Sequence, residues 1–184
     1  GVEFNLAEKM MLQVLSRAYG RSTGAVNRLY KSKGDLGDAA YALASDKKSD
    51  EDGLGVTQVY ESLFKIAEDK GEGSQERKVE GMARLLAALD PYSAKFAARI
   101  PVGKLRLGFS DATLLDAFSF MERGDKSGRR EIEAAYNVTA DIGKIARQVK
   151  KTGIKSLERV VAKPGIPIRP SLAERLKDIE EIFE

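Results

Sequence analysis

The sequence predicts an all-α protein, and three observations lead to this prediction. Apolar residues recur at helical spacing through most of the chain, alternating strand patterns are nearly absent, and capping residues or glycines separate the periodic segments. The 184 residues are 42% hydrophobic and 32% charged, which is ordinary for a globular domain with a buried core. No apolar run approaches the length that crosses a membrane.

The first part of the chain is expected to hold six helices. Asn5 and Gly20 are expected to cap and end the first helix, and the second closes near Gly34. Asp35 caps the third, and the polar stretch from Ser45 to Gly53 is predicted as a loop. The remaining three follow Thr57, Ser74 and the pair Asp90-Pro91, in which proline takes the first helical position.

The later part is expected to hold three more helices and an extended end. They run from about Ser110 to Met121, around Ile132 to Tyr136, and from Asp141 through Val149. Pro164, Pro167 and Pro170 recur at every third residue, which excludes a helix and predicts an extended segment.

A short internal repeat indicates two related halves. In each copy a tyrosine near a helix end precedes an aspartate cap by five residues, and a glycine follows in the first turn of the next helix. Such a glycine lets another backbone pass close, or leaves N–H groups open to an anion. The two copies are Tyr30-x4-Asp35-Leu36-Gly37-x2-Ala40 and Tyr136-x4-Asp141-Ile142-Gly143-x2-Ala146. We interpret them as helical halves with a pseudo-twofold relation.

The residue types that are missing exclude several chemistries. The chain has no cysteine and no histidine. Disulfides, thiolate catalysis, histidine-based triads and the usual zinc ligands are therefore ruled out. This makes an enzyme built from this chain alone an unfavoured hypothesis, and we predict neither catalytic nor metal-binding residues.

Charge is distributed unevenly and favours a polyanionic partner. The net charge is +3, whereas residues from Leu172 to the end carry −3, so the preceding body carries +6. A basic body of this kind is compatible with a nucleic acid.

Two stretches combine glycines with cations at a helix start. One is Gly103-Lys104-Leu105-Arg106-Leu107-Gly108, which runs into a helix at Ser110. The other is Gly71-Glu72-Gly73-Ser74-Gln75-Glu76-Arg77-Lys78, in which Ser74 is expected to cap a helix. Glycine permits close approach of a ligand, and helix starts offer N–H donors and a partial positive charge. Both stretches suit a phosphate backbone, although each is also compatible with an ordinary solvated loop.

Other charged residues have simpler interpretations. Asp111 and Asp116 are too far apart on a helix to form a catalytic pair, and Asp111 is interpreted as a first-turn acid. Lys144, Arg147 and Lys151, with Lys150 and Lys155 nearby, are interpreted as a solvated helix face.

Taken together, these motifs resemble the N-terminal DNA-binding domain of ATP-dependent DNA ligases, closest to the archaeal type. The resemblance covers essentially the whole chain and depends on five motifs in order. They are Lys33-Gly34-Asp35-Leu36-Gly37, Gly71-Glu72-Gly73-Ser74-Gln75-x2-Lys78, Gly103-Lys104-Leu105-Arg106-Leu107-Gly108, Ala135-Tyr136-Asn137-x-Thr139-x-Asp141 and Gly165-x-Pro167-Ile168-Arg169-Pro170-x-Leu172-Ala173.

The resemblance implies an all-helical domain of two pseudo-symmetric halves, followed by a short extended segment and a C-terminal helix. It implies sequence-independent binding of nicked double-stranded DNA through the phosphate backbone. The residues implied in DNA binding are Lys33, Gly34, Gly71, Gly73, Ser74, Gln75, Lys78, Gly103, Lys104, Arg106, Gly108 and Ser110.

The parent enzyme of this family joins 3′-hydroxyl and 5′-phosphate ends through lysyl-AMP and DNA-adenylate, using ATP and Mg²⁺. Its lysine lies in a Lys-x-Asp-Gly motif, which this chain lacks, since Leu36 follows Lys33-Gly34-Asp35. We expect an inactive fragment that binds no cofactor itself. Residues 1–162 would form the DNA-binding domain, incomplete at its start and therefore with exposed apolar surface, and residues 163–184 would form the linker and the first part of the adenylation domain.

The resemblance also implies partners and a location. The partners are the downstream adenylation and OB domains and, for the parent protein, a sliding clamp; no membrane is involved. The location is the cytoplasm, at the nucleoid, with roles in DNA replication, repair and recombination. Two alternatives remain open, namely a helical protein-interaction scaffold without a nucleic-acid role and a self-sufficient enzyme.

Overall fold

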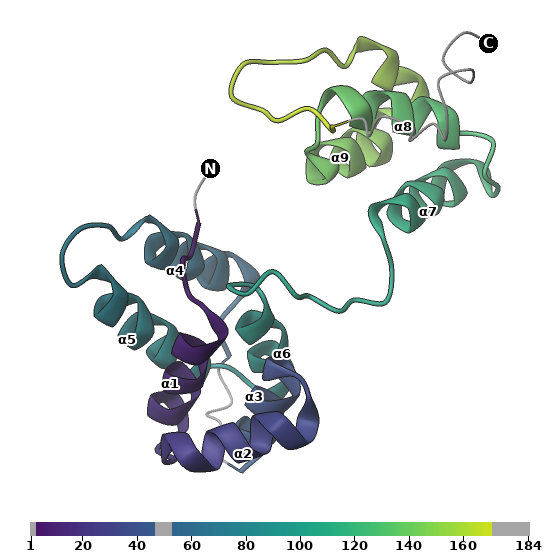
Figure 1. The fold of residues 1–184 in the computed structure, drawn as a ribbon. Helices are drawn as coiled ribbons and strands as arrows, with labels where there is room; N and C mark the ends of the chain where they lie inside the picture. The colour runs from purple at the N-terminus through teal and green to yellow at the C-terminus, as the bar shows by residue number, and fades with distance from the viewer. Residues whose placement is uncertain (1–2, 47–52, 171–184) are drawn as a thin grey trace, which may run out of the picture. The chain divides into compact units, whose positions relative to one another are not determined.

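The structure, a computed structural model, describes residues 3–46 and 53–170, and these residues form helices and connecting segments without a β-strand. The all-α prediction is confirmed (Figure 1). The chain divides into two compact units, Gly1–Leu105 and Arg106–Glu184. The division falls inside the Gly103–Gly108 stretch.

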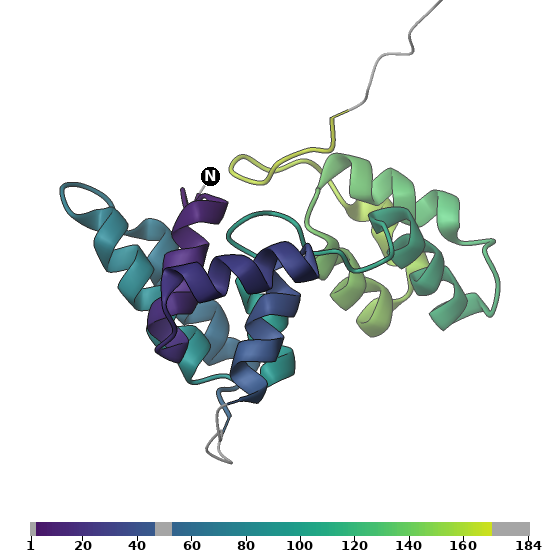
Figure 2. The same ribbon diagram turned by 60° about the horizontal axis from the view of Figure 1, so that its bottom comes forward.

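The described residues of unit 1 form a bundle of six helices. α1 packs along α5, α5 also packs against α4, and α3 lies against α6 (Figures 1 and 2). The helices are α1 (Glu8–Tyr19), α2 (Thr23–Lys33), α3 (Leu36–Ser45), α4 (Val56–Glu68), α5 (Ser74–Ala87) and α6 (Pro91–Arg99). Met11, Leu15, Met82 and Leu86 are completely buried, so the seam between α1 and α5 forms the centre of the core.

Most of the predicted helix ends in unit 1 are confirmed. Asp35 accepts a hydrogen bond from the backbone N–H of Asp38 (2.9 Å), and Asp90 accepts from Tyr92 and Ser93 (2.9 and 3.1 Å). These side chains satisfy N–H groups that have no partner within the helix. Gly34 ends α2 in the left-handed conformation that C-caps favour.

Two predicted caps are wrong. Asn5 lies in a left-handed conformation (φ 52°), and Ala7 is the residue that precedes α1. Ser74 is the first residue inside α5, because Gly73 takes the cap position with φ 72°. An asparagine and a glycine both tolerate left-handed backbone, and this lets the chain turn one or two residues away from the expected points.

The start of α3 is buried beneath α6. Arg99 donates from Nε and Nη2 to Oδ1 of Asp35 (2.9 and 2.7 Å), and both side chains are about 6% exposed. A Cβ on Gly37 would lie 2.6 Å from the carbonyl oxygen of Lys95, so glycine is required here for close approach of the two helices. Gly37 therefore has the role of letting another backbone pass close, which is one of the two roles expected for a glycine in the first turn of a helix.

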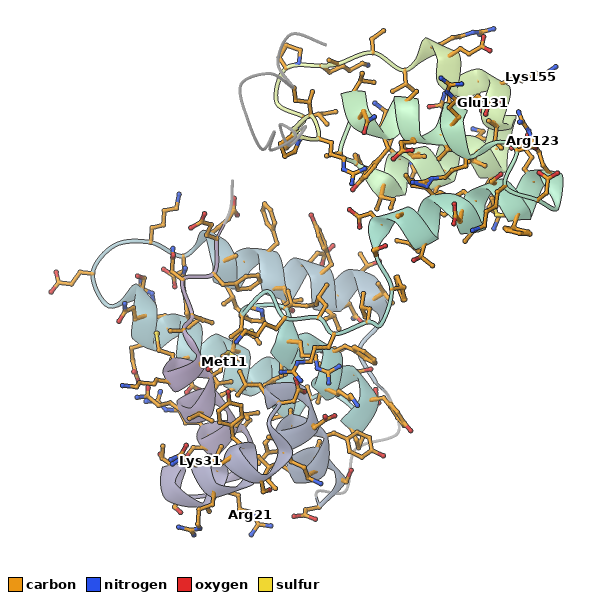
Figure 3. The ribbon with its side chains drawn as sticks, turned by 45° about the vertical axis from the view of Figure 1, so that its right-hand side comes forward. Met11, Arg21, Lys31, Arg123, Glu131 and Lys155 are labelled. Atoms are coloured by element: carbon orange, nitrogen blue, oxygen red, sulfur yellow. The ribbon has the colours of Figure 1, made fainter. Side chains whose placement is uncertain are left out.

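Unit 2 holds three α-helices and a 3₁₀ helix in its described residues. They are α7 (Asp111–Arg123), α8 (Arg129–Val138), α9 (Ile142–Thr152) and η1 (Ile154–Arg159). Leu115, Ile132, Ile145 and Ile154 are completely buried and come from all four elements. Arg123 of α7 pairs with Glu131 of α8 (2.9 Å), and the two side chains meet between these helices (Figure 3). The sequence did not predict η1, because six residues are too few for a helical period to show.

The predicted extended segment is present beyond η1. It contacts the end of α8 through two backbone hydrogen bonds, Ala140 N–H to Pro167 O (2.8 Å) and Arg169 N–H to Asn137 O (3.2 Å). The guanidinium of Arg169 lies 5.5 Å from the ring centre of Tyr136. The predicted C-terminal helix and Leu172-Ala173 lie outside the described residues, as does most of the Ser45–Gly53 loop. The domain boundary at residues 162/163 stays a prediction.

Two surface properties complete the description. Within residues 3–46 and 53–170, every helix is too short or too polar to cross a bilayer. On α4, Val56, Tyr60 and Phe64 follow one another at four-residue spacing and are 88%, 64% and 41% exposed. These three side chains give unit 1 an exposed apolar row.

Candidate nucleic-acid interface

Several candidate residues of unit 1 lie around the segment that precedes α1. Two surface hollows meet at Asn5. One is lined by Gly71, Ser74 and Gln75, and the other by Lys104 with Val102. Two stretches that are about 30 positions apart in sequence therefore lie on either side of the same short segment.

Glu8, at the start of α1, joins Lys104 to the end of α2. Its Oε1 accepts from Nζ of Lys104 (2.6 Å), and its Oε2 accepts from the hydroxyl of Tyr30 (3.2 Å). Tyr30 lies three residues before Lys33, in the last turn of α2. The structure thus joins Lys104 and the last turn of α2 to the start of α1, whereas Lys33 and Gly34 line neither of the two hollows that meet at Asn5.

The Gly71–Gln75 stretch forms a tight turn into α5. Gly71 and Gly73 have φ values of 87° and 72°, and the N–H of Ser74 donates to the carbonyl of Gly71 (3.2 Å). Residues with side chains rarely adopt this backbone conformation, so the turn depends on both glycines. The result is a backbone surface free of Cβ atoms beside the start of a helix, which offers N–H groups to an anion.

Arg77, in the first turn of α5, already has an anionic partner. It donates from Nε and Nη2 to the two carboxylate oxygens of Asp69 (2.9 and 2.6 Å). These hydrogen bonds hold the pKa of Asp69 below its usual range, and the positive charges of Arg77 and Lys78 act in the same direction. The carboxylate of Asp69 therefore balances the positive charge of Arg77 at this helix start, so the arginine does not by itself indicate a bound anion.

Lys78 occupies the interior of unit 1. Only 4% of the residue is exposed, and its ammonium donates to the carbonyls of Phe4 (2.9 Å) and Ala67 (3.2 Å). In this conformation it holds the segment before α1 against the end of α4. Its implied contact with DNA stays a prediction that would require the ammonium to leave these two acceptors.

The Gly103–Gly108 stretch and Ser110 are fully on the surface, and they are shared between the two units. Gly103 and Lys104 belong to unit 1, and the remaining candidates belong to unit 2. Arg106 has a φ of 50°, which is unusual for a residue with a side chain, and Gly108 has a φ of 77°. Ser110 precedes α7, and its N–H donates to Oγ1 of Thr113 (3.4 Å).

In the part of the chain that the structure describes, acidic residues do not gather into a group able to hold a metal ion. The full sequence contains no Lys-x-Asp-Gly motif.

The sequence does not reveal the two acids that form ion pairs with cations of the candidate stretches, Glu8 and Asp69. The sequence indicates Glu8 only as a residue near a helix start, and it does not single out Asp69. Glu8 pairs with Lys104, which is distant in sequence. Asp69 pairs with Arg77, at a spacing that is not one of the usual side-chain pairings within a helix. No local pattern reveals a pair of residues that are 96 positions apart, so only the fold could show the first pair.

Comparisons with known proteins agree with the resemblance found in the sequence. Residues 1–119 match the model of the family described as DNA ligase N terminus. The chain is 40% identical over 192 aligned positions to DNA ligases of Saccharolobus shibatae, Saccharolobus islandicus and Saccharolobus solfataricus. Each alignment covers 99% of this chain and 32% of the relative, so the chain spans about a third of the length of these curated relatives.

Proposed function

Because this chain belongs to the DNA ligase N terminus family, we propose that it is the DNA-binding module of an ATP-dependent DNA ligase. The module binds double-stranded DNA through the phosphate backbone and does not read the base sequence. The observation that carries the proposal is the position of Gly71–Gln75 and Lys104 on either side of the segment before α1. Lys33 and Gly34, at the end of α2, belong to the proposal through the family resemblance.

The chemistry of this surface favours phosphate over bases. Backbone N–H groups at the α5 start and the cation Lys104 are donors, which match phosphate oxygens. Gly71 has open space where a Cβ would stand, so a bulky backbone can approach there, whereas the guanidinium of Arg77 lies 3.1 Å from that position on Gly73. Unit 2 has a stretch of its own, in which Arg106 is a cation, Gly108 is an open backbone position and Ser110 carries a hydroxyl. Contacts of this kind position a duplex and carry no sequence information.

The proposal is tested by duplex titration at several salt concentrations. We expect a Kd of about 10⁻⁴ to 10⁻⁶ M near physiological salt, similar for duplexes of different sequence. The variant Lys104→Ala/Arg106→Ala should weaken binding to every duplex, and its log–log salt slope should fall by about 0.9 for each phosphate that is no longer bound.

A charge-matched variant separates local contacts from net charge. Lys9 and Arg28 are exposed cations outside the candidate stretches, so Lys9→Ala/Arg28→Ala lowers the net charge equally. If both double variants bind as the unaltered chain does at all salt concentrations, the site assignment is wrong. If the unaltered chain binds no duplex, nicked or intact, the proposed function is wrong.

The wider roles of the parent protein are part of the same proposal. The parent seals 3′-hydroxyl/5′-phosphate nicks with ATP and Mg²⁺, in the cytoplasm at the nucleoid, during replication, repair and recombination. Its downstream adenylation and OB domains, and a sliding clamp, are the proposed partners. The family match gives no support to the alternative of a protein-interaction scaffold without a nucleic-acid role.

A further inference from the structure

A short segment of unit 2 carries more positive charge than the whole chain. Residues 143–159 contain six cations and one acid, which gives a net charge of +5, against +3 for all 184 residues. The segment comprises most of α9, the turn that follows and all of η1. Such an imbalance is unfavourable in a folded protein unless an anion compensates for it.

Five of these cations surround one groove. Lys144, Arg147 and Lys151 line it from α9, while Lys155 and Arg159 line it from η1, around a volume of about 680 Å³. Lys155 extends outward from the surface of the unit (Figure 3). We call this the α9–η1 groove. From the sequence, the three cations of α9 are interpreted as a solvated helix face. In the structure, η1 forms the opposite side of the groove and contributes two more cations.

Neutral hydrogen bonds hold the two sides of the α9–η1 groove together. Gln148 donates from Nε2 to the carbonyl of Ser156 (2.8 Å), and the hydroxyls of Thr152 and Ser156 are 2.8 Å apart. Ser156 also donates to the carbonyl of Gly153 (2.7 Å). All these groups line the groove or the turn beneath it, so the spacing of the cation rows is fixed before any ligand binds.

The turn between α9 and η1 is fixed from its other side by α7. The N–H of Ile154 donates to Oε2 of Glu122 (2.7 Å), and a Cβ on Gly153 would lie 2.8 Å from Oε1 of the same residue. Gly153 has a φ of 81° and a ψ of 166°, a conformation that is essentially restricted to glycine. The groove is therefore a built feature of unit 2.

Several other cations of the same unit pair with acids. Arg123 pairs with Glu131, while Lys126 and Arg129 both pair with Asp116. Within the described part of the chain, no carboxylate lines the α9–η1 groove, and none of its five cations forms an ion pair. The missing counter-charge points to a ligand that supplies several negative charges in a row.

We propose that the α9–η1 groove binds the phosphodiester backbone of one DNA strand, an inference that rests on the proposed function. Lys144 and Lys151 are seven residues apart, or about 10 Å along a helix, which is about three phosphate steps along a duplex axis. The lining offers ammonium, guanidinium, hydroxyl and amide donors and no aromatic ring. It therefore suits phosphate oxygens and gives no platform for stacked bases.

The test compares two triple variants of the full chain. Lys151→Gln/Lys155→Gln/Arg159→Gln removes three groove cations, and Lys9→Gln/Arg28→Gln/Arg130→Gln removes three cations elsewhere on the surface. Each phosphate that is no longer bound should raise the duplex Kd about eightfold near 0.1 M salt and lower the salt slope by about 0.9. The groove variant should exceed the matched control on both measures.

The outcomes separate this inference from the proposed function. If the groove variant and its control are equal while Lys104→Ala/Arg106→Ala loses affinity, the groove inference is overturned and the proposed function stands. If the unaltered chain binds no duplex, both are overturned. If the groove variant alone loses affinity, the inference is supported and the assignment of the Gly103–Gly108 stretch is not.

Backbone amide chemical shifts give a second and independent measurement. Duplex DNA should shift the amide signals of Thr152, Gly153 and Ser156 in the unaltered chain and leave them in place in the groove variant. An acidic peptide with the sequence of residues 171–184 is the competing ligand. If that peptide shifts these signals and the duplex does not, the groove binds an acidic peptide and the inference is wrong.

Discussion

Tyr136, near the end of α8, donates its phenolic hydrogen to Oδ2 of Asp111, the first residue of α7 (2.6 Å). The same relationship exists in unit 1, where Tyr30 near the end of α2 donates to Glu8, the first residue of α1 (3.2 Å). The hydrogen bond to Asp111 raises the pKa of Tyr136 above its usual range. Each tyrosine thus ties the end of one helix to the start of the helix before it, which extends the internal repeat beyond its sequence motif.

Removing either phenolic hydroxyl should weaken its own unit. Hydrogen bonds to charged acceptors contribute about 1.5–3 kcal/mol, and we expect Tyr136→Phe to fall in this range. Tyr30→Phe should cost about 0.5–1.5 kcal/mol, because its bond is longer, 3.2 Å against 2.6 Å. Urea unfolding measures both free energies. An equal or larger loss for Tyr30→Phe would contradict this ranking.

The two first-turn glycines should respond oppositely to alanine. A methyl group on Gly37 meets the carbonyl of Lys95 at 2.6 Å, so Gly37→Ala should cost about 1–3 kcal/mol through overpacking. Gly143 meets only Oδ1 of Asp141, at an ordinary 3.5 Å, and its φ is not positive. Gly143→Ala should therefore be neutral or add up to about 1 kcal/mol. Thermal or urea unfolding of the pair checks this, and destabilisation by Gly143→Ala would show an unrecognised contact.

Glu8 should restrain DNA binding, because it neutralises Lys104. In Glu8→Gln the amide can still accept from Tyr30, while the lysine loses its carboxylate partner. We expect the duplex Kd to fall several-fold, up to about eightfold near 0.1 M salt, with a salt slope steeper by up to about 0.9. Glu61→Gln, an exposed site on α4, is the charge-matched control. Equal effects in the two variants would mean that only net charge matters.

Unfolding at high pH should depend on Tyr19. Burial raises its pKa to about 12, and its hydroxyl donates to the carbonyl of Leu86 (3.2 Å). The unfolded chain then loses this proton at a lower pH than the folded one, so the stabilisation is complete below about pH 10 and falls between about pH 10 and 12. The loss should be on the order of 2 kcal/mol. Tyr19→Phe should remove this component, and Tyr60→Phe, at a 64% exposed site, should leave it.

The chain should not form a covalent adduct with AMP. It has no Lys-x-Asp-Gly motif to supply the nucleophilic lysine. Incubation with ATP and Mg²⁺ followed by intact-mass measurement should show an unchanged mass. An added adenylate would assign catalysis to this segment and overturn the binding-module proposal.

Helical periodicity and caps are enough to predict the class and most helix ends. Asp35, Asp90 and Asp141 cap the helices expected of them, because a side chain accepting from an N–H two or three residues on is a local interaction. The caps predicted at Asn5 and Ser74 are wrong because Asn5 and Gly73 adopt left-handed backbone, which turns the chain at points other than the expected caps.

The site is harder to predict than the fold, because its contacts are not local. The sequence singles out Lys78 as a surface cation, whereas the fold buries it among carbonyls. It leaves Arg159 unremarked, whereas the turn at Gly153 brings η1 beside α9. Charge in a sequence indicates that a cation is present, and only tertiary structure decides whether that cation faces water, a carboxylate or the interior.

The position of Lys78 also bears on where this unit can be cut. Its buried ammonium has two acceptors, and one of them is the carbonyl of Phe4, before the first helix begins. A version of the unit starting at Ala7 would keep every helix and still lose that acceptor. The segment before α1 thus supplies a hydrogen-bond acceptor to a buried ammonium group. Helix boundaries alone are therefore a poor guide to the smallest stable version of this protein.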